Sequence, residues 1–350
     1  MITRRYDAAV FGAKRRALPD ICADLVAAVG RRDGAAFDAA EAALPRAVRR
    51  ADGAEMTRAV AVLRPAIEEF GVGSGGELAR LAGGLLEVGA DPGAVIGVLA
   101  LHGAEALEAA VLLPPLWKGR GGVGRPDPQR LPEVLERCGP ENRHVVEAWF
   151  AADEWVRALL VPLQRREVRA ALPHRERLLA AAQAAAEVVE GASFLPGLLR
   201  VLDDETVVVL HRADGRAFEV TIGGIGDNFQ LHTLLAHALI GGGLLPGTPP
   251  EPRWVAAATD GDPEPRGGIQ GQFNLVDAFG EWIWNEGAPA DIPLLGGRRV
   301  IVVDPPPYPR GWNAGRVYPL MAPLARVDRP LGAAEAAEWM GRIAPDAYAR

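Results

Sequence analysis

Hydrophobic side chains recur at helical spacing through the first half of the chain. Two clear stripes follow steps of three and four residues: Val60, Leu63, Ile67 and Phe70, then Val145, Trp149, Ala152, Val156 and Leu159. Segments rich in glycine or proline separate such stripes at 71–76, 92–93, 114–115 and 119–128. The pattern predicts an all-helical domain over residues 1–190, with about seven or eight helices. No fixed repeat period is present, so a solenoid arrangement stays open.

After residue 190 the pattern changes to short runs rich in β-branched residues. Strands are expected at 198–202, 206–210, 217–222, 254–258, 270–276, 281–284, 299–303 and 324–327. Asp214-Gly215 predicts a hairpin turn, and a helix is expected at 228–240. Most connections are too short for parallel crossovers. We therefore predict a two-domain fold: the helical domain, then an α+β domain with a mostly antiparallel sheet over 191–331, and a C-terminal helical tail over 332–350.

Charge and composition narrow the choice of partners. The chain of 350 residues has 38 basic and 45 acidic side chains, a net charge of −7 that lies mostly after residue 190. Nucleic acid is therefore not an expected partner, because binding phosphates requires clustered cations. No apolar segment resembles a signal peptide, and no uninterrupted apolar run approaches the roughly 18 residues of a membrane span, so we expect a cytoplasmic protein with no membrane partner.

Several kinds of chemistry lack their motif. The serines are Ser74 and Ser193, and neither lies in a G-x-S-x-G elbow. The glycine-rich segment 118–124 lacks the Gly-Lys-Ser/Thr ending of a phosphate loop and is interpreted as a flexible helix connection. Cys22 and Cys138 lie too far apart along the sequence for a cysteine zinc cluster, and Cys138 is interpreted as a buried side chain rather than a nucleophile.

Metal and cofactor sites are not expected either. Only His232 and His237 are close in sequence, and five positions on a helix separate them by about 140°. A helical zinc site uses histidines four positions apart, so the sequence predicts neither a metal ion nor a cofactor.

The segment around residue 225 combines a strand, a glycine turn and a helix start, an arrangement that often forms a ligand site. Its candidate binding residues are Gly224, Gly226 and Asp227. Asp227 is placed to cap the helix, with Gln230 as its capping-box partner, so the turn favours a neutral or cationic group, or capping alone. On the following helix, His232 is expected at the edge of the buried face, within reach of substrate, and His237 in solvent.

Aromatic and polar side chains are dense further along the chain. Period-two geometry puts Trp282 and Trp284 on one strand face, where they cover a core or form an aromatic wall for a ligand. Neighbouring candidates are Asp277, Glu281 and Asn285. The strand at 299–303 then leads into a proline-stiffened loop that carries Asp304, Tyr308, Arg310, Trp312 and Asn313. The alternative is a loop that covers a sheet edge.

Two functional hypotheses follow. The first is an enzyme that transfers protons through His232, with Asp277, Glu281 or Asp304 as its partner and Tyr308 or Arg310 as a donor. Such chemistry suits a lyase, cyclase, isomerase or hydrolase acting on a peptide or small organic molecule in a biosynthetic tailoring pathway. The alternative is a non-catalytic protein that binds a peptide or partner protein in an aromatic groove. Both require the glycine turn, the two tryptophans and the proline-rich loop to meet at one concave surface.

Overall fold

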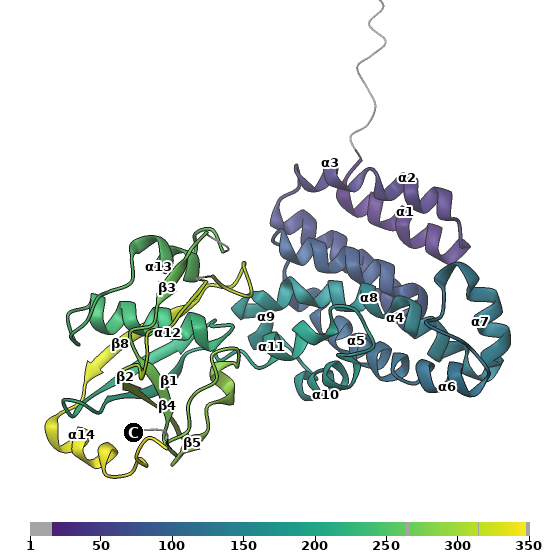
Figure 1. Cartoon of the computed structure of the whole chain (residues 1–350). Coiled ribbons are helices and arrows are strands. Elements are labelled where there is room, and N and C mark those ends of the chain that lie inside the picture. Colours follow the sequence, from purple (N-terminus) through teal and green to yellow (C-terminus); the bar gives the residue numbers. More distant parts are fainter. Residues whose placement is uncertain (1–15, 264–265, 314, 348–350) are drawn as a thin grey trace, which may run out of the picture. The chain divides into compact units, whose positions relative to one another are not determined.

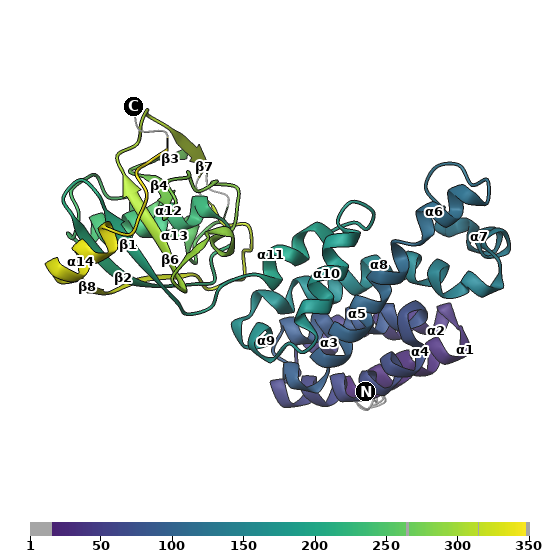
Figure 2. The same cartoon turned by 90° about the horizontal axis from the view of Figure 1, so that it is seen from below.

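The computed structural model describes residues 16–263, 266–313 and 315–347. The chain divides into two compact units, one of residues 1–162 and 171–193 and the other of residues 163–170 and 194–350. Figures 1 and 2 show helices throughout the first unit and a sheet with helices in the second. The predicted fold class is confirmed: a helical region over 18–199 precedes a mixed, mostly antiparallel sheet region over 205–340.

The helical unit consists of α-helices joined by short turns. They are α1 (Leu18–Arg31), α2 (Gly34–Glu41), α3 (Leu44–Val48), α4 (Gly53–Glu87), α5 (Ile96–Ala110), α6 (Leu113–Gly119), α7 (Leu131–Cys138), α8 (Arg143–Leu160) and α10 (Arg175–Ala185). Single 3-10 turns lie at Pro92–Ala94, Pro128–Arg130, Pro140–Asn142, Pro162–Gln164 and Ala192–Phe194. The core forms where α4 packs on α1 and α8, and where α5 packs on α8 and α10.

The predicted break at 71–76 is a kink inside α4 rather than a loop. Gly71 adopts a left-handed conformation with φ of 59° within the helix, which glycine tolerates at little steric cost. The indole nitrogen of Trp155 on α8 donates a hydrogen bond of 2.8 Å to the carbonyl of Val72. A tertiary contact therefore satisfies a backbone acceptor beside the kink, and the chain continues as a helix.

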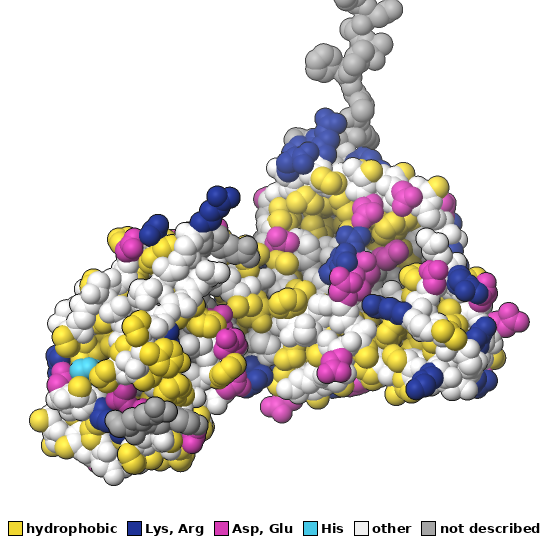
Figure 3. All heavy atoms as spheres, viewed as in Figure 1, with side chains coloured by type: hydrophobic (Ala, Val, Ile, Leu, Met, Phe, Trp, Pro, Cys, Tyr) yellow, Lys and Arg dark blue, Asp and Glu magenta, His cyan; other side chains and the backbone are white. Residues whose placement is uncertain are grey.

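Residues 96–119 are long and apolar enough to cross a membrane by length and composition alone. Within this segment, 56% of the most apolar window is buried inside the structure, and the chain turns between α5 and α6. Burial of this kind is typical of a core helix. On the face of the helical unit seen in Figure 3, basic and acidic side chains lie intermixed, and many form ion pairs such as Arg80–Glu154 at 2.7 Å.

The second unit is built on one main sheet. Its strands are β1 (Glu205–His211), β2 (Arg216–Gly223), β4 (Asn274–Asp277), β5 (Leu294–Leu295), β6 (Arg298–Asp304) and β8 (Leu324–Pro330). Their order is β4-β6-β1-β2-β8, with β5 beside β6. The β1–β6 pair is parallel and the other pairs are antiparallel. A separate antiparallel ribbon joins β3 (Gly268–Gln270) to β7 (Gly311–Asn313).

Helices cover both faces of this sheet. On one face α12 (Asn228–Ala236), which continues as a π-helical turn over His237–Gly241, packs against Val207 and Val209 of β1. On the other face α14 (Ala333–Met340) packs near Val208 and Leu210 of the same strand. Successive side chains of a strand point to opposite faces, so β1 contributes to two cores at once. The predicted C-terminal helix is thus part of the sheet unit's packing.

Several predicted strands are wrong. The segment 198–202 begins with the last two residues of α11 (Leu195–Leu199) and continues as a turn and irregular backbone, and 254–258 belongs to α13 (Pro252–Ala258). Each helix has a proline in its first turn, where a missing N–H costs nothing. Their apolar residues bury one helical face, which short apolar runs do not reveal. The segment 281–284 makes only an isolated bridge from Trp282 to Val276, and 270–276 is divided between β3 and β4.

Candidate functional site

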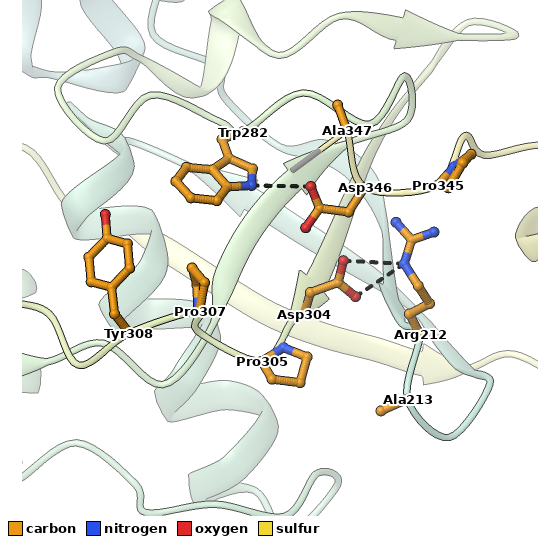
Figure 4. A pocket seen from close by; sticks show the side chains of 10 residues that line it. All are labelled: Arg212, Ala213, Trp282, Asp304, Pro305, Pro307, Tyr308, Pro345, Asp346 and Ala347. Atoms are coloured by element: carbon orange, nitrogen blue, oxygen red, sulfur yellow. Dashed lines mark hydrogen bonds and ion pairs between the residues drawn. The ribbon is translucent and has the colours of Figure 1, made fainter. Parts of the chain in front are cut away.

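The sheet unit contains an open cavity of about 1150 Å³. Four segments of the chain line it. They are the turn after β1 with Arg212, the residue Trp282, the end of β6 with the loop that carries Asp304 and Tyr308, and the segment around Asp346. Figure 4 shows the rings of Trp282 and Tyr308 on one side and the carboxylates of Asp304 and Asp346 on the other. Rings of Pro305, Pro307 and Pro345 complete the wall.

An ion pair fixes one side of this cavity. Asp304 is the last residue of β6 and only 7% exposed. Nε of Arg212 lies 3.2 Å from each of its carboxylate oxygens, and Nη1 of the same guanidinium donates to the carbonyl of Ala344 at 3.1 Å. The guanidinium therefore joins the hairpin, the end of β6 and the segment after α14, which holds the two charges in place.

A second contact fixes the aromatic side. The indole nitrogen of Trp282 donates to Oδ1 of Asp346 at 3.2 Å. Backbone hydrogen bonds hold the same segment along the turn after β4, from Ala344 N–H to the carbonyl of Ala278 at 2.9 Å and from Ala347 N–H to that of Gly280 at 3.0 Å. A side chain at Gly280, whose φ is 90°, would collide with the carbonyl of Pro345. Tyr308 also lines the cavity and is 54% exposed.

His232 lies in a different place, where it is fully buried beside the partly buried side chains of Arg310 and Trp312. Its Nε2 lies 3.1 Å from both the nitrogen and the carbonyl oxygen of Phe273, and its ring meets that of Trp312 edge-on at 4.7 Å between centroids. Burial, and to a smaller extent the positive charge of Arg310, together lower the pKa of His232 from 6.5 to about 4, against an opposing effect of the hydrogen bond to Phe273. The expected position at an accessible edge is wrong, since His232 has 0% exposure.

Contacts around His232 also involve Arg310 and Trp312. Nη2 of Arg310 donates to the carbonyl of Phe273 at 3.1 Å and to Oδ1 of Asn274 at 2.8 Å. Trp312 also contacts Phe229, with 5.4 Å between ring centroids. In the part of the chain that the structure describes, His232 has no hydrogen bond to Asp277, Glu281 or Asp304. These side chains therefore support packing between α12 and the β3–β7 ribbon.

The glycine turn is occupied by its own structure. Asp227 accepts the N–H of Gln230 at 2.7 Å, and Oε1 of Gln230 accepts the N–H of Gly226 at 2.9 Å, so the predicted cap forms. The carbonyl of Asn285 accepts the N–H groups of Asn228 and Phe229, each at 3.1 Å. Gly224, with φ of 62°, lies against the carbonyl of Ala322. The N–H groups of Gly226 and of the first turn of α12 are thus already satisfied.

The remaining candidates also have structural contacts or face solvent. Oδ1 of Asp277 accepts the N–H groups of Phe279 at 2.8 Å and Glu281 at 3.0 Å, which closes the turn after β4. Trp284 is 72% exposed and lies outside the cavity lining. Asn313 pairs with Gly268 in the small ribbon. Among the residues that the structure describes, no group of three or more histidine, cysteine or acidic side chains is placed to hold a metal ion.

The structure therefore brings together Trp282, Asp304 and Tyr308, and separates them from His232, Arg310 and Trp312. Sequence patterns missed Arg212 and Asp346, which line the same cavity as Asp304. Arg212 follows a strand like any surface arginine, and Asp346 lies 64 positions from Trp282. No local motif marks either residue, because their meeting depends on how the sheet and the segment after α14 pack.

Comparisons of this chain with protein-family models, with curated proteins and with solved structures found no match. Its function is therefore inferred from its own geometry and chemistry.

Proposed function

We propose that the sheet unit is a peptide-binding module, and that its cavity holds an extended segment carrying a basic side chain. The observation that supports this most directly is the composition of one cavity: two aromatic rings and three prolines beside two carboxylates and one guanidinium. This proposal takes up the binding hypothesis from the sequence, with a groove built from Trp282, Tyr308, Asp304 and Asp346.

The apolar part of the wall suits an extended peptide. Trp282 and Tyr308 offer flat faces with few rotatable bonds, so contact with them costs little side-chain entropy. Pro305 and Pro307 restrict the backbone that leads to Tyr308. Grooves lined by aromatic rings recognise proline-rich and extended peptides in this manner.

The polar part favours a cation. Asp304 and Asp346 contribute two negative charges to the lining, and Arg212 contributes one positive charge. An entering ammonium or guanidinium group gains attraction from the carboxylates of the lining and from the adjacent aromatic faces, while Arg212 is held by Asp304. A polyanion such as nucleic acid gains neither, so it is not part of this proposal.

Proton transfer by His232 receives no comparable support. The ring is enclosed, its pKa is lowered to about 4, and the carboxylates proposed as its partners lie elsewhere. A general base near neutral pH needs access to substrate and a pKa close to the working pH. The enzyme hypothesis stays a prediction of the sequence.

Isothermal titration of the whole chain with three acetylated and amidated peptides tests the binding function. The peptides share a proline- and leucine-rich frame and differ only in a central Arg, Gln or Glu. We expect the Arg peptide to bind about ten-fold more tightly than the Gln peptide, a difference near 1.4 kcal/mol, and the Glu peptide to bind least.

Two exposed aromatic residues provide a matched pair of variants. Tyr308→Ala removes part of the cavity wall and is expected to weaken binding of the Arg peptide. Trp284→Ala removes an exposed ring outside the lining and is expected to leave the affinity for this peptide unchanged. Asp346→Asn should reduce the preference for Arg over Gln. Equal affinity for all three peptides, no binding, or equal effects of the two aromatic variants would each overturn the proposal.

A further inference from the structure

The helical unit has a cavity of its own, of about 550 Å³, next to the glycine-rich segment after α6. Its wall includes the indoles of Trp117 and Trp149, the cations Lys118 and Arg125, and the exposed apolar residue Val123. All lining residues belong to the first unit. A volume of this size lies in the range of small-molecule sites, about 300–1000 Å³.

The glycine-rich segment connects α6 to the next helical turn, and hydrogen bonds hold its first residues. The N–H of Gly122 donates to the carbonyl of Trp117 at 2.9 Å, and that of Gly121 to the carbonyl of Lys118 at 3.1 Å. These bonds satisfy acceptors at the end of α6. A side chain at Gly122 would collide with the Trp117 ring, so glycine allows the backbone to lie directly against the indole.

Arg137 on α7 adds a second restraint. Its Nη1 donates to the carbonyl of Gly121 at 3.0 Å, and its guanidinium carbon lies 5.1 Å from the centre of the Trp117 ring. Backbone hydrogen bonds and a cation–π contact thus hold the first indole in place. A binding wall that is fixed before the ligand arrives loses less entropy on binding.

The charges around this cavity are unbalanced. Lys118 and Arg125 are exposed, and neither forms an ion pair with any residue that the structure describes. The neighbouring Arg120, by contrast, is paired with Glu141 at 3.3 Å. One carboxylate, that of Glu187, lines the cavity. Two cations against one anion leave an excess of positive charge beside the indoles.

Arg125 also links the charge to the aromatic wall. Its guanidinium carbon lies 5.3 Å from the centre of the Trp149 ring, which is a favourable distance for a cation over an indole face. In that position a guanidinium keeps several N–H donors for a carboxylate, and two of them donate parallel hydrogen bonds to the two carboxylate oxygens. Aromatic surface and anion recognition thus occur within one small site.

We infer that this cavity binds a small aromatic carboxylate. The flat apolar body of the ligand lies against Trp117 and Trp149 and covers Val123, and its carboxylate faces Lys118 and Arg125. The inference is independent of the peptide-binding function, since the two cavities share no residue.

Titration of the whole chain with matched probes tests it, with tryptophan fluorescence and calorimetry as readouts. The probes are benzoate, 2-naphthoate and indole-3-acetate, each beside its neutral amide, together with the cation tryptamine. We expect at least one carboxylate to bind about ten-fold or more tightly than its amide, to weaken as salt is added, and tryptamine to bind least.

Two double variants with the same change in net charge separate the cavity from the general surface. Lys118→Gln with Arg125→Gln removes both cations of the lining and is expected to weaken carboxylate binding about ten-fold or more, with little change in affinity for the amide. Arg120→Gln with Arg130→Gln removes two exposed cations outside the lining and is expected to leave affinity unchanged. Equal binding of acid and amide, equal effects of the two double variants, or no binding of any probe would overturn the inference.

Discussion

Nε2 of His232 lies 3.1 Å from the backbone nitrogen of Phe273 and 3.1 Å from its carbonyl oxygen. That carbonyl also accepts a hydrogen bond from Arg310 at 3.1 Å. A neutral imidazole that accepts the Phe273 N–H suits this arrangement, whereas an imidazolium would put a second positive charge beside Arg310 in the protein interior. Helix α12 is thus anchored to the start of β4 by a histidine that remains uncharged.

The anchoring makes stability depend on pH. The pKa of His232 is lowered from 6.5 to about 4 in the folded chain, so between these values the unfolded chain binds a proton that the folded chain does not. Neutral His232 contributes fully to the free energy of unfolding above pH 6.5. As the pH falls toward 4, the free energy of unfolding decreases by about 3 kcal/mol in total. Urea unfolding of the native chain at pH 7.5 and 4.5 measures it. His232→Gln should reduce this pH dependence, and substitution of the exposed His237 by Gln should not.

The close contact between α4 and α8 predicts opposite effects at two adjacent glycines. A Cβ at Gly83 would lie 2.5 Å from the carbonyl oxygen and 2.7 Å from Cα of Ala158, both backbone atoms. Gly83→Ala should therefore separate the helices and cost about 3 kcal/mol. A Cβ at Gly84 meets nothing within 4 Å, so Gly84→Ala should gain up to about 1 kcal/mol from helix propensity. Denaturant unfolding compares them, and equal effects would rule out this helix contact.

Both cysteine thiols are expected to be unreactive in the folded protein. Burial raises the pKa of Cys22 to about 12 and also raises that of Cys138, and each side chain is buried. Because the thiolate is the reactive form, a colorimetric disulfide reagent at pH 8 should react only on the timescale of unfolding. Concentrated guanidinium chloride should expose both thiols at once, and Cys22→Ser and Cys138→Ser assign each one. Fast reaction of native Cys138 would contradict its interpretation as a buried, unreactive side chain.

The cap at the start of α12 predicts a graded series. Asp227→Ala removes the acceptor for the N–H of Gln230 and should cost about 1–2 kcal/mol. Asp227→Asn should retain stability, since asparagine caps equally well and burial raises the pKa of Asp227, which means that its charge is disfavoured in the folded state. Thermal unfolding at pH 7 measures the order. A destabilised Asn variant would show that the charge itself is needed.

Local sequence signals predicted the parts of the fold that local physics determines. Asp214-Gly215 forms the turn between β1 and β2, and Asp227 with Gln230 caps α12. The predicted strand at 299–303 is β6, which is buried on both faces as its continuous apolar run indicates. In each case neighbouring residues are enough to define the structure.

Prediction from sequence was weaker where contacts between residues far apart in the chain determine the structure. Residues 254–258 form a helix because Trp254 and Ala257 pack on the β3–β7 ribbon, with Ile269 as a neighbour. His232 is enclosed because the ribbon carrying Trp312 covers it. Arg212 and Asp304 meet across 92 positions. None of these contacts can be predicted from a local sequence pattern, since each depends on tertiary packing.

The single parallel pairing in the described sheet, Val208 to Leu210 with Val300 to Val302, has a consequence for how this unit folds. The β1–β2 hairpin closes a short turn and forms quickly, whereas the pairing of β1 with β6 must close a loop of many tens of residues. Until that loop closes, Val208 and Leu210 of the hairpin stay accessible to solvent and to other chains. The pairing of β6 with β1 should then limit the rate of refolding. At high protein concentration, refolding chains should aggregate through the hairpin before β6 has paired with it.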